Sequence, residues 1–67
     1  MVDTELLQVE MRSRGYTLER IALELGRSRT CIFNKIHNKS EFRASEVNKI
    51  ARVLKLSKAQ TNRIFFA

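Results

Sequence analysis

The sequence has few of the residues that stabilise small proteins through disulfides or bound metal ions. Its 67 residues include one cysteine, Cys31, and one histidine, His37, and they contain no proline and no tryptophan. A single cysteine excludes an internal disulfide, and Cys31 with His37 does not supply a zinc site. No apolar run approaches the roughly 20 residues of a membrane span, and no signal-peptide pattern is present. We therefore expect one domain over residues 1–67 in a reducing cytosol, with no metal, cofactor or membrane partner.

Catalytic constellations are also missing from the sequence. We find no nucleophile paired with a base, no cluster of carboxylates and no glycine-rich phosphate loop, so we expect no enzymatic activity. A chain of 67 residues builds a single small core, which leaves no room for an inducer pocket. We accordingly expect no small-molecule ligand.

What the chain does have is an uneven excess of positive charge. The net charge is +6, but residues 1–25 carry three basic and five acidic residues, whereas residues 26–67 carry ten basic and two acidic ones. No acidic residue follows Glu46. A block this basic predicts a surface for a polyanion, of which nucleic acid is the commonest.

Helix-start and helix-stop signals divide the chain into five short segments. Thr17, Ser28 and Ser57 are expected N-caps, and Gly15 and Gly26 are expected stops. Apolar residues recur at helical spacing in each segment, and nowhere do they alternate long enough for a strand. The sequence predicts an all-α domain with helices over about 4–14, 18–25, 29–37, 45–54 and 58–66.

Residues 17–37 carry the most informative spacing. One helix ends at Gly26 and Ser28 caps the next, so the corner between them is tight. Gly26 can adopt a positive φ, and the small Ala22 lets the helices approach. Four apolar residues would then join the pair: Ile21, Leu25, Ile32 and Ile36. This spacing predicts a helix-turn-helix, and the alternative is an ordinary helical corner without a ligand.

Four segments follow one another in a family pattern: GYTLERIA at 15–22, LGRSRT at 25–30, NKIHNKSEF at 34–42 and SEVNKIARVL at 45–54. With them, the stretch 15–66 resembles the Cro- and lambda-repressor-like helix-turn-helix family of phages and mobile elements. The resemblance implies a compact five-helix DNA-binding domain. Leu18, Arg27, Cys31 and Phe33 depart from the family pattern.

The expected third helix would present its base-reading residues from its first turns. Steps of about 100° per residue place Ile32 and Ile36 inward and Asn34 outward, with Thr30 beside it. Arg29 could fork onto guanine, Asn34 could pair with adenine, and the Thr30 methyl suits thymine. In the family that the chain resembles, the matching positions read bases, and the position of Ser28 lies beside the backbone. Phe33 and His37 are expected at the boundary of this face.

Phosphate contacts require reach and charge more than exact geometry. The candidates that flank the third helix are Thr17, Arg27, Lys35, Lys39, Ser40 and Arg43.

Phe65 and Phe66 are adjacent, so one helix cannot turn both into the same core. We expect one to pack inside and the other to serve as a dimer contact, since two half-sites give the selectivity that one helix lacks. The leading hypothesis is a Cro-like repressor that binds a double-stranded operator as a homodimer in a bacterial or phage-infected cell. The alternative is an antagonist that binds a partner repressor protein.

Overall fold

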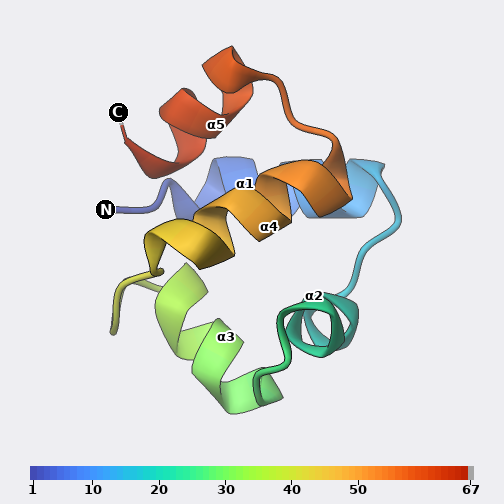
Figure 1. Ribbon diagram of the computed structural model, residues 1–67, viewed down its shortest axis with the longest axis vertical. Helices are drawn as coiled ribbons and strands as arrows, with labels where there is room; N and C mark the ends of the chain where they lie inside the picture. The colour runs from blue at the N-terminus through green and yellow to red at the C-terminus, as the bar shows by residue number, and fades with distance from the viewer. Residues whose placement is uncertain (67) are drawn as a thin grey trace.

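Five α-helices make up the computed structural model, which describes residues 1–66 (Figure 1). The expected all-α class is confirmed, and no strand occurs within that range. The helices are α1 (Thr4–Ser13), α2 (Leu18–Leu25), α3 (Arg29–Ile36), α4 (Ala44–Leu54) and α5 (Lys58–Phe65).

Polar side chains fix where most helices begin. The hydroxyls of Thr17, Ser28 and Ser57 each accept a hydrogen bond from the backbone N–H three residues on, at 3.1–3.2 Å. These N-caps agree with the sequence-based prediction because capping is a local interaction. Asp3 caps α1 in the same way, at 3.1 Å to the Leu6 N–H. For α4 the N-cap is Arg43, whose backbone N–H donates to the Glu46 carboxylate at 2.8 Å.

The core lies where the inner faces of all five helices meet. Figure 1 shows α4 crossing in front of α1, with α5 on one side of this pair and α2 and α3 on the other. Each helix contributes apolar residues, and those of α1, α3 and α4 recur at helical spacing. The buried set is Leu7, Met11, Ile21, Ala22, Ile32, Ile36, Val47, Ile50, Leu54, Ile64 and Phe65.

The first residues of the chain are tied to distant parts of the fold. The Asn38 amide accepts from the Val2 N–H at 2.8 Å and donates to the Val2 carbonyl at 3.0 Å. The Thr4 hydroxyl donates to the Ile36 carbonyl at 2.7 Å, and the Asp3 N–H donates to the Ile64 carbonyl at 2.7 Å. The start of α1 therefore closes over the ends of both α3 and α5. Across residues 1–66, no helix has the length and apolarity that crossing a membrane requires.

Candidate nucleic-acid interface

The corner between α2 and α3 positions the candidate interface. Gly26 has φ +66°, a left-handed conformation that turns the chain at the end of α2, and Ser28 begins α3 two residues later. The Arg27 N–H donates to the Ala22 carbonyl at 3.0 Å, which closes the turn. In Figure 1, α2 is seen nearly end-on whereas α3 runs across the view, so the two helices cross steeply. Such a crossing leaves the first turns of α3 free to project from the molecule.

The exposed face of α3 differs from the sequence-based expectation, which centred it on Asn34. Thr30 is exposed and Asn34 is half-buried, whereas the boundary residue Phe33 retains 39% of its accessible surface. The difference arises because the inner face includes Lys35 as well as Ile32 and Ile36. The outward direction therefore turns from Asn34 toward Thr30.

Arg29 is exposed at the start of α3, but it is not free. Its Nε donates to the Glu19 carboxylate of α2 at 3.0 Å, and both side chains are more than 60% exposed. The hydrogen bond of Glu19 with its own backbone N–H, together with that from Arg29, lowers the pKa of its carboxyl. The bond uses Nε, and the two terminal nitrogens of Arg29 form no hydrogen bond within residues 1–66.

Lys35 does not lie where a phosphate-binding residue should. It is only 8% exposed, and its Nζ donates to the Glu46 carboxylate at 2.6 Å. The expectation that Lys35 contacts phosphate is therefore corrected. The charge of Lys35 is compensated inside the protein, because its side chain extends to Glu46 on α4. The spacing of apolar residues identifies only apolar inward positions. A charged residue such as Lys35 was therefore assigned to the surface.

Glu46 is the residue that the sequence analysis missed. Its buried carboxylate accepts hydrogen bonds from Lys35, from the Arg27 Nε at 3.1 Å and from the Arg43 N–H. Burial on its own raises the pKa of Glu46, but the hydrogen bonds from Lys35 and the Arg43 backbone, with that from Arg27, outweigh it and lower the pKa. One carboxylate thus joins the turn before α3, α3 itself and the start of α4.

The remaining phosphate candidates lie at the surface around α3. Thr17 is exposed at the start of α2, Lys39 and Ser40 are exposed in the loop after α3, and Arg43 is exposed at the start of α4. Ser28 is exposed at the start of α3. Arg27 is also exposed, but its Nε is bonded to Glu46. The structure brings these groups to the two flanks of α3.

An aromatic pair continues the exposed face of α3. The rings of Phe33 and His37 lie 4.3 Å apart, and the Lys39 ammonium sits 5.8 Å from the centre of the Phe33 ring. This apolar surface borders a shallow cavity lined by α1, by Leu18 and by Arg29. Cys31, on the other flank, is a half-buried free thiol.

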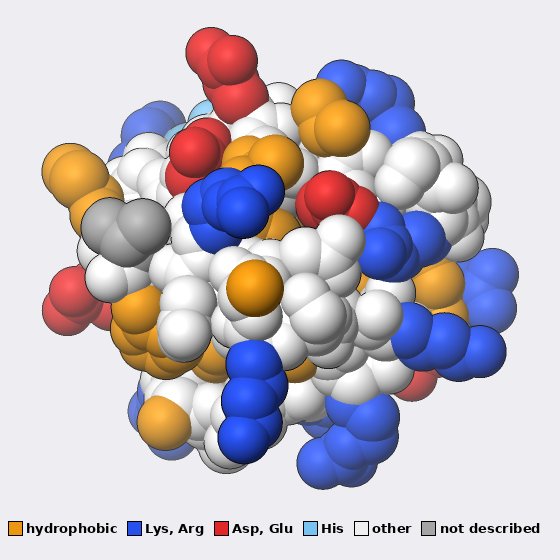
Figure 2. Space-filling view, turned by 90° about the horizontal axis from the view of Figure 1, so that it is seen from above, with side chains coloured by type: hydrophobic (Ala, Val, Ile, Leu, Met, Phe, Trp, Pro, Cys, Tyr) orange, Lys and Arg blue, Asp and Glu red, His pale blue; other side chains and the backbone are white. Residues whose placement is uncertain are grey.

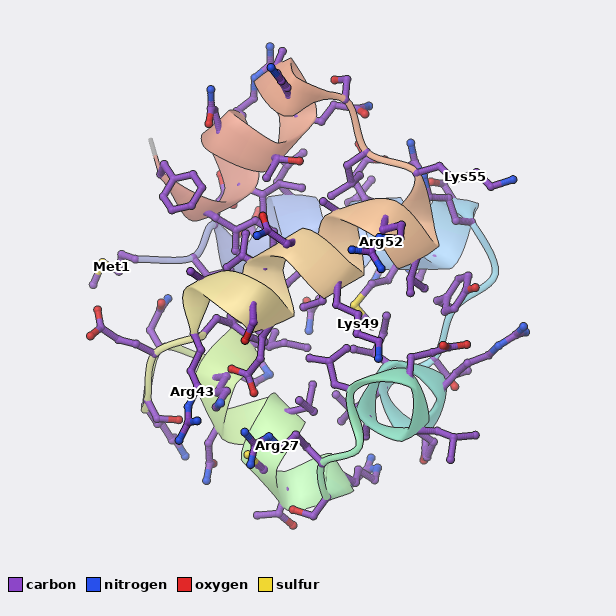
Figure 3. The ribbon with its side chains drawn as sticks, viewed as in Figure 1. Met1, Arg27, Arg43, Lys49, Arg52 and Lys55 are labelled. Atoms are coloured by element: carbon purple, nitrogen blue, oxygen red, sulfur yellow. The ribbon has the colours of Figure 1, made fainter. Side chains whose placement is uncertain are left out.

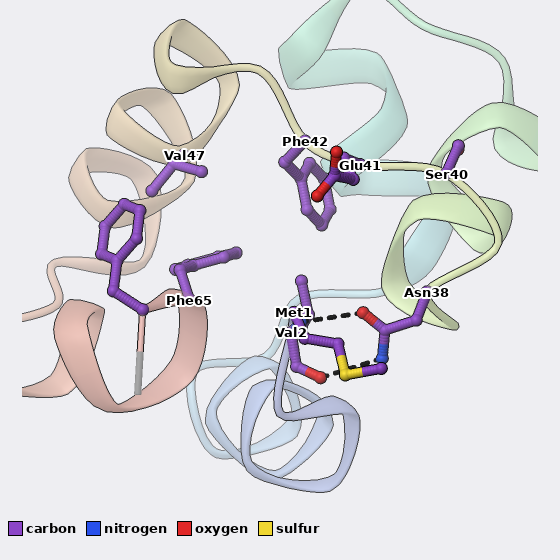
Figure 4. Close-up of a pocket in the computed structure, with 9 residues that line it drawn as sticks. Met1, Val2, Asn38, Ser40, Glu41, Phe42, Val47 and Phe65 are labelled. Atoms are coloured by element: carbon purple, nitrogen blue, oxygen red, sulfur yellow. Dashed lines mark hydrogen bonds between the residues drawn. The ribbon is translucent and has the colours of Figure 1, made fainter.

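The two terminal phenylalanines separate as expected. Phe65 is buried and meets Phe42 edge-to-face, with centroids 5.7 Å apart, whereas Phe66 is 66% exposed. Both border a hollow of about 200 Å³ beside Met1 and Asn38 (Figure 4). One apolar side chain therefore stays available at the surface next to a concave site.

Comparisons with protein-family models, with curated proteins and with solved structures found no match. Within residues 1–66, no three His, Cys, Asp or Glu side chains gather in a way that could hold a metal ion. The functional argument therefore depends on the geometry of this chain.

Proposed function

We propose that the protein is a sequence-specific, double-stranded DNA-binding regulator in which α2 and α3 act as a helix-turn-helix. The observation that carries the proposal is the exposed start of α3, which projects from a steep, glycine-turned corner on a basic protein. An α-helix held in this way fits the major groove, and its first residues then meet the base edges. The lambda-repressor-like fold and its Cro-like role belong to this proposal.

Two exposed residues of α3, Arg29 and Thr30, and the half-buried Asn34 supply three kinds of base contact. The terminal nitrogens of Arg29 form a fork for guanine, since only its Nε is engaged by Glu19. Thr30 offers a methyl group for thymine, and Asn34 offers an amide for adenine. Glu19 serves as a positioning residue because it holds the base of the Arg29 fork.

The surrounding groups would hold the phosphate backbone. Lys39 and Arg43 provide charge on one flank of α3, and Thr17 lies at the start of α2 on the other. Ser40 and the exposed side of Arg27 extend this set. The α2 and α3 N-termini add the positive ends of two helix dipoles.

One α3 contacts too few base pairs to select a site in a genome, so a homodimer on a palindromic operator is part of the proposal. Repression by occupying the operator and excluding polymerase is the mode of action that belongs to this proposal.

Selection from a random duplex pool at about physiological salt tests the proposal. We expect the retained sequences to contain an inverted repeat whose halves lie about one helical turn apart. A single enriched half-site would support sequence-specific DNA binding but contradict the homodimer. A pool that shows no enrichment would overturn the proposed function.

A second candidate function is favoured by one observation. Phe33 is exposed on α3 and stacked on His37, an arrangement that suits a protein contact as well as a thymine methyl. A chain of this kind would antagonise a partner repressor by covering its surface. Tight binding to such a partner, lost in Phe33→Ala, together with an unselective DNA pool, would favour this candidate.

A further inference from the structure

The unpaired positive charge is concentrated on α4 and not on α3. Among residues 1–66, four of the Lys and Arg side chains form ion pairs, and three of those, Arg27, Arg29 and Lys35, belong to the corner and to α3. Four cations on α4 or capping its ends have no such partner, and we call them the α4 row: the N-cap Arg43, Lys49, Arg52 and the C-cap Lys55.

The α4 row occupies one exposed surface. Val47, Ile50 and Leu54 turn inward, so positions 49 and 52 lie on the outer side of the helix. Figure 3 shows Arg52 on the side of α4 that faces the viewer, Lys49 beside the helix and Lys55 at its end, whereas Arg43 lies at the start of α4 and Arg27 lies over α3. From the first to the last cation the row spans about 18 Å, at about 1.5 Å per residue. Figure 2, seen from above, shows basic side chains over much of that face, many of them toward its lower and right-hand edges.

This surface and the Phe33 side of α3 face different ways. Phe33, His37 and Arg29 border a cavity whose other walls come from α1 and from the start of α2. Figure 1 shows α1 behind α4, so the wall of the cavity that α1 provides lies behind α4 in that view. Lys35 and Glu46, which join α3 to α4, fill the space between the two surfaces. The outer part of the row, Lys49 to Lys55, is therefore directed away from a duplex held by α3.

The composition of the row favours a phosphate backbone over a protein. Protein interfaces are anchored by aromatic and aliphatic side chains, and lysine is depleted in them. The exposed large apolar residues are Met1, Val9, Leu23, Phe33 and Phe66, none of which is on α4. Between its cations the outer face of α4 carries Ser45 and Asn48, which are small and polar. Spaced cations without an apolar anchor match the requirements of phosphate contacts, which need charge and reach.

We propose that the outer part of the α4 row, Lys49 to Lys55, is a second DNA-backbone-binding surface, which holds a duplex segment other than the one read by α3, so that the protein bridges two segments. The proposal rests on the proposed function, because the first segment is the one bound at α3. The second segment is bound without regard to sequence, since the row carries no group placed to read bases in a groove.

A capture experiment with the full chain tests the bridge. A biotinylated duplex that carries the selected site is fixed on beads, and a labelled duplex of unrelated sequence is added with the protein at about 0.15 M salt. We expect the wild-type protein to retain the labelled duplex. In Lys49→Gln/Arg52→Gln, the loss of two phosphate contacts should lower its retention by about 30-fold, with little change in binding to the bead-bound site.

The matched control removes the same charge elsewhere. Arg12→Gln/Arg63→Gln changes two exposed cations, one on α1 and one on α5, that form no ion pair in residues 1–66, and it should retain the labelled duplex. Equal losses of retained labelled duplex in the two variants would overturn the proposal. No loss in either variant would also overturn it, because a dimer that uses two copies of α3 would then explain the bridging. If the protein binds the bead-bound site but retains no labelled duplex, only the bridging proposal is overturned. If it binds neither duplex, the proposed function is overturned as well.

Discussion

At the scale of single residues, the organising feature is a buried carboxylate that bonds to three groups. A buried charge is costly unless it is paired and hydrogen-bonded, and Glu46 meets both conditions through Lys35, Arg27 and the Arg43 N–H. Removing the carboxylate charge would leave Lys35 buried without compensation. The ion pair therefore stabilises the relation of α3 to α4 and keeps Lys35 away from any ligand.

Glu46→Gln tests the energetic role of this pair. Because the folded-state pKa of Glu46 is lowered, its contribution to stability is present above the unfolded value of about 4.3 and is lost as pH falls below it. We expect the variant to lose about 2–3 kcal/mol of unfolding free energy at pH 7. We also expect it to lose less additional stability than the wild type between pH 6 and pH 3. Urea unfolding at the two pH values measures both effects, and parallel losses on acidification would contradict the assignment.

Asn34→Ala and Lys39→Ala should have different effects on DNA. Asn34→Ala should cost about 1–3 kcal/mol on the selected site and relax preference at one base pair, because its amide is the proposed reader of a base edge. Lys39→Ala should weaken all sequences alike and lower the slope of log K against log salt by about one. Titrations on matched and scrambled duplexes at several salt concentrations separate the two. A uniform loss for Asn34→Ala would remove it from the base-reading set.

At the scale of helices, what the sequence could predict depended on how local the signal was. The starts of α2, α3 and α5 were predicted because Thr17, Ser28 and Ser57 each bond within their own first turn. The partners of Glu46 lie 3 to 19 residues away, and only the folded chain shows that they converge on it. The order of helices and much of the core were thus predictable, whereas the inward orientation of Lys35 was not. Lys49, Arg52 and Lys55 were visible as charge, but nothing in the sequence placed them apart from α3.

The end of α4 offers a test at the same scale. Lys55 has φ +58°, a left-handed conformation that helix ends usually assign to glycine. Lys55→Gly should raise stability by up to about 1 kcal/mol, the relieved backbone strain exceeding the entropy that glycine adds to the unfolded chain. Thermal unfolding measures this gain. Because the variant also removes one cation from the α4 row, it should bridge less DNA while being more stable, and a loss of stability would contradict the strain argument.

At the scale of the whole molecule, the exposed Phe66 is the contact that the proposed homodimer would use. It lines the hollow beside Met1, and 66% of its surface is exposed. Phe66→Ser should leave the unfolding free energy of the monomer within about 0.5 kcal/mol, since the side chain is mostly exposed. It should weaken self-association, and sedimentation across a concentration series measures the shift. Phe65→Ala is the contrast, because a buried phenylalanine costs about 3–5 kcal/mol when truncated.

The hydrogen bonds at the start of the chain have a consequence for biosynthesis. Translation proceeds from the N-terminus, and the backbone of Val2 bonds to the Asn38 side chain while the Asp3 N–H bonds to the Ile64 carbonyl. The start of α1 therefore cannot complete its contacts until Ile64 has been translated. We expect the Asp3 amide to exchange slowly with deuterium only when α1 and α5 are packed together.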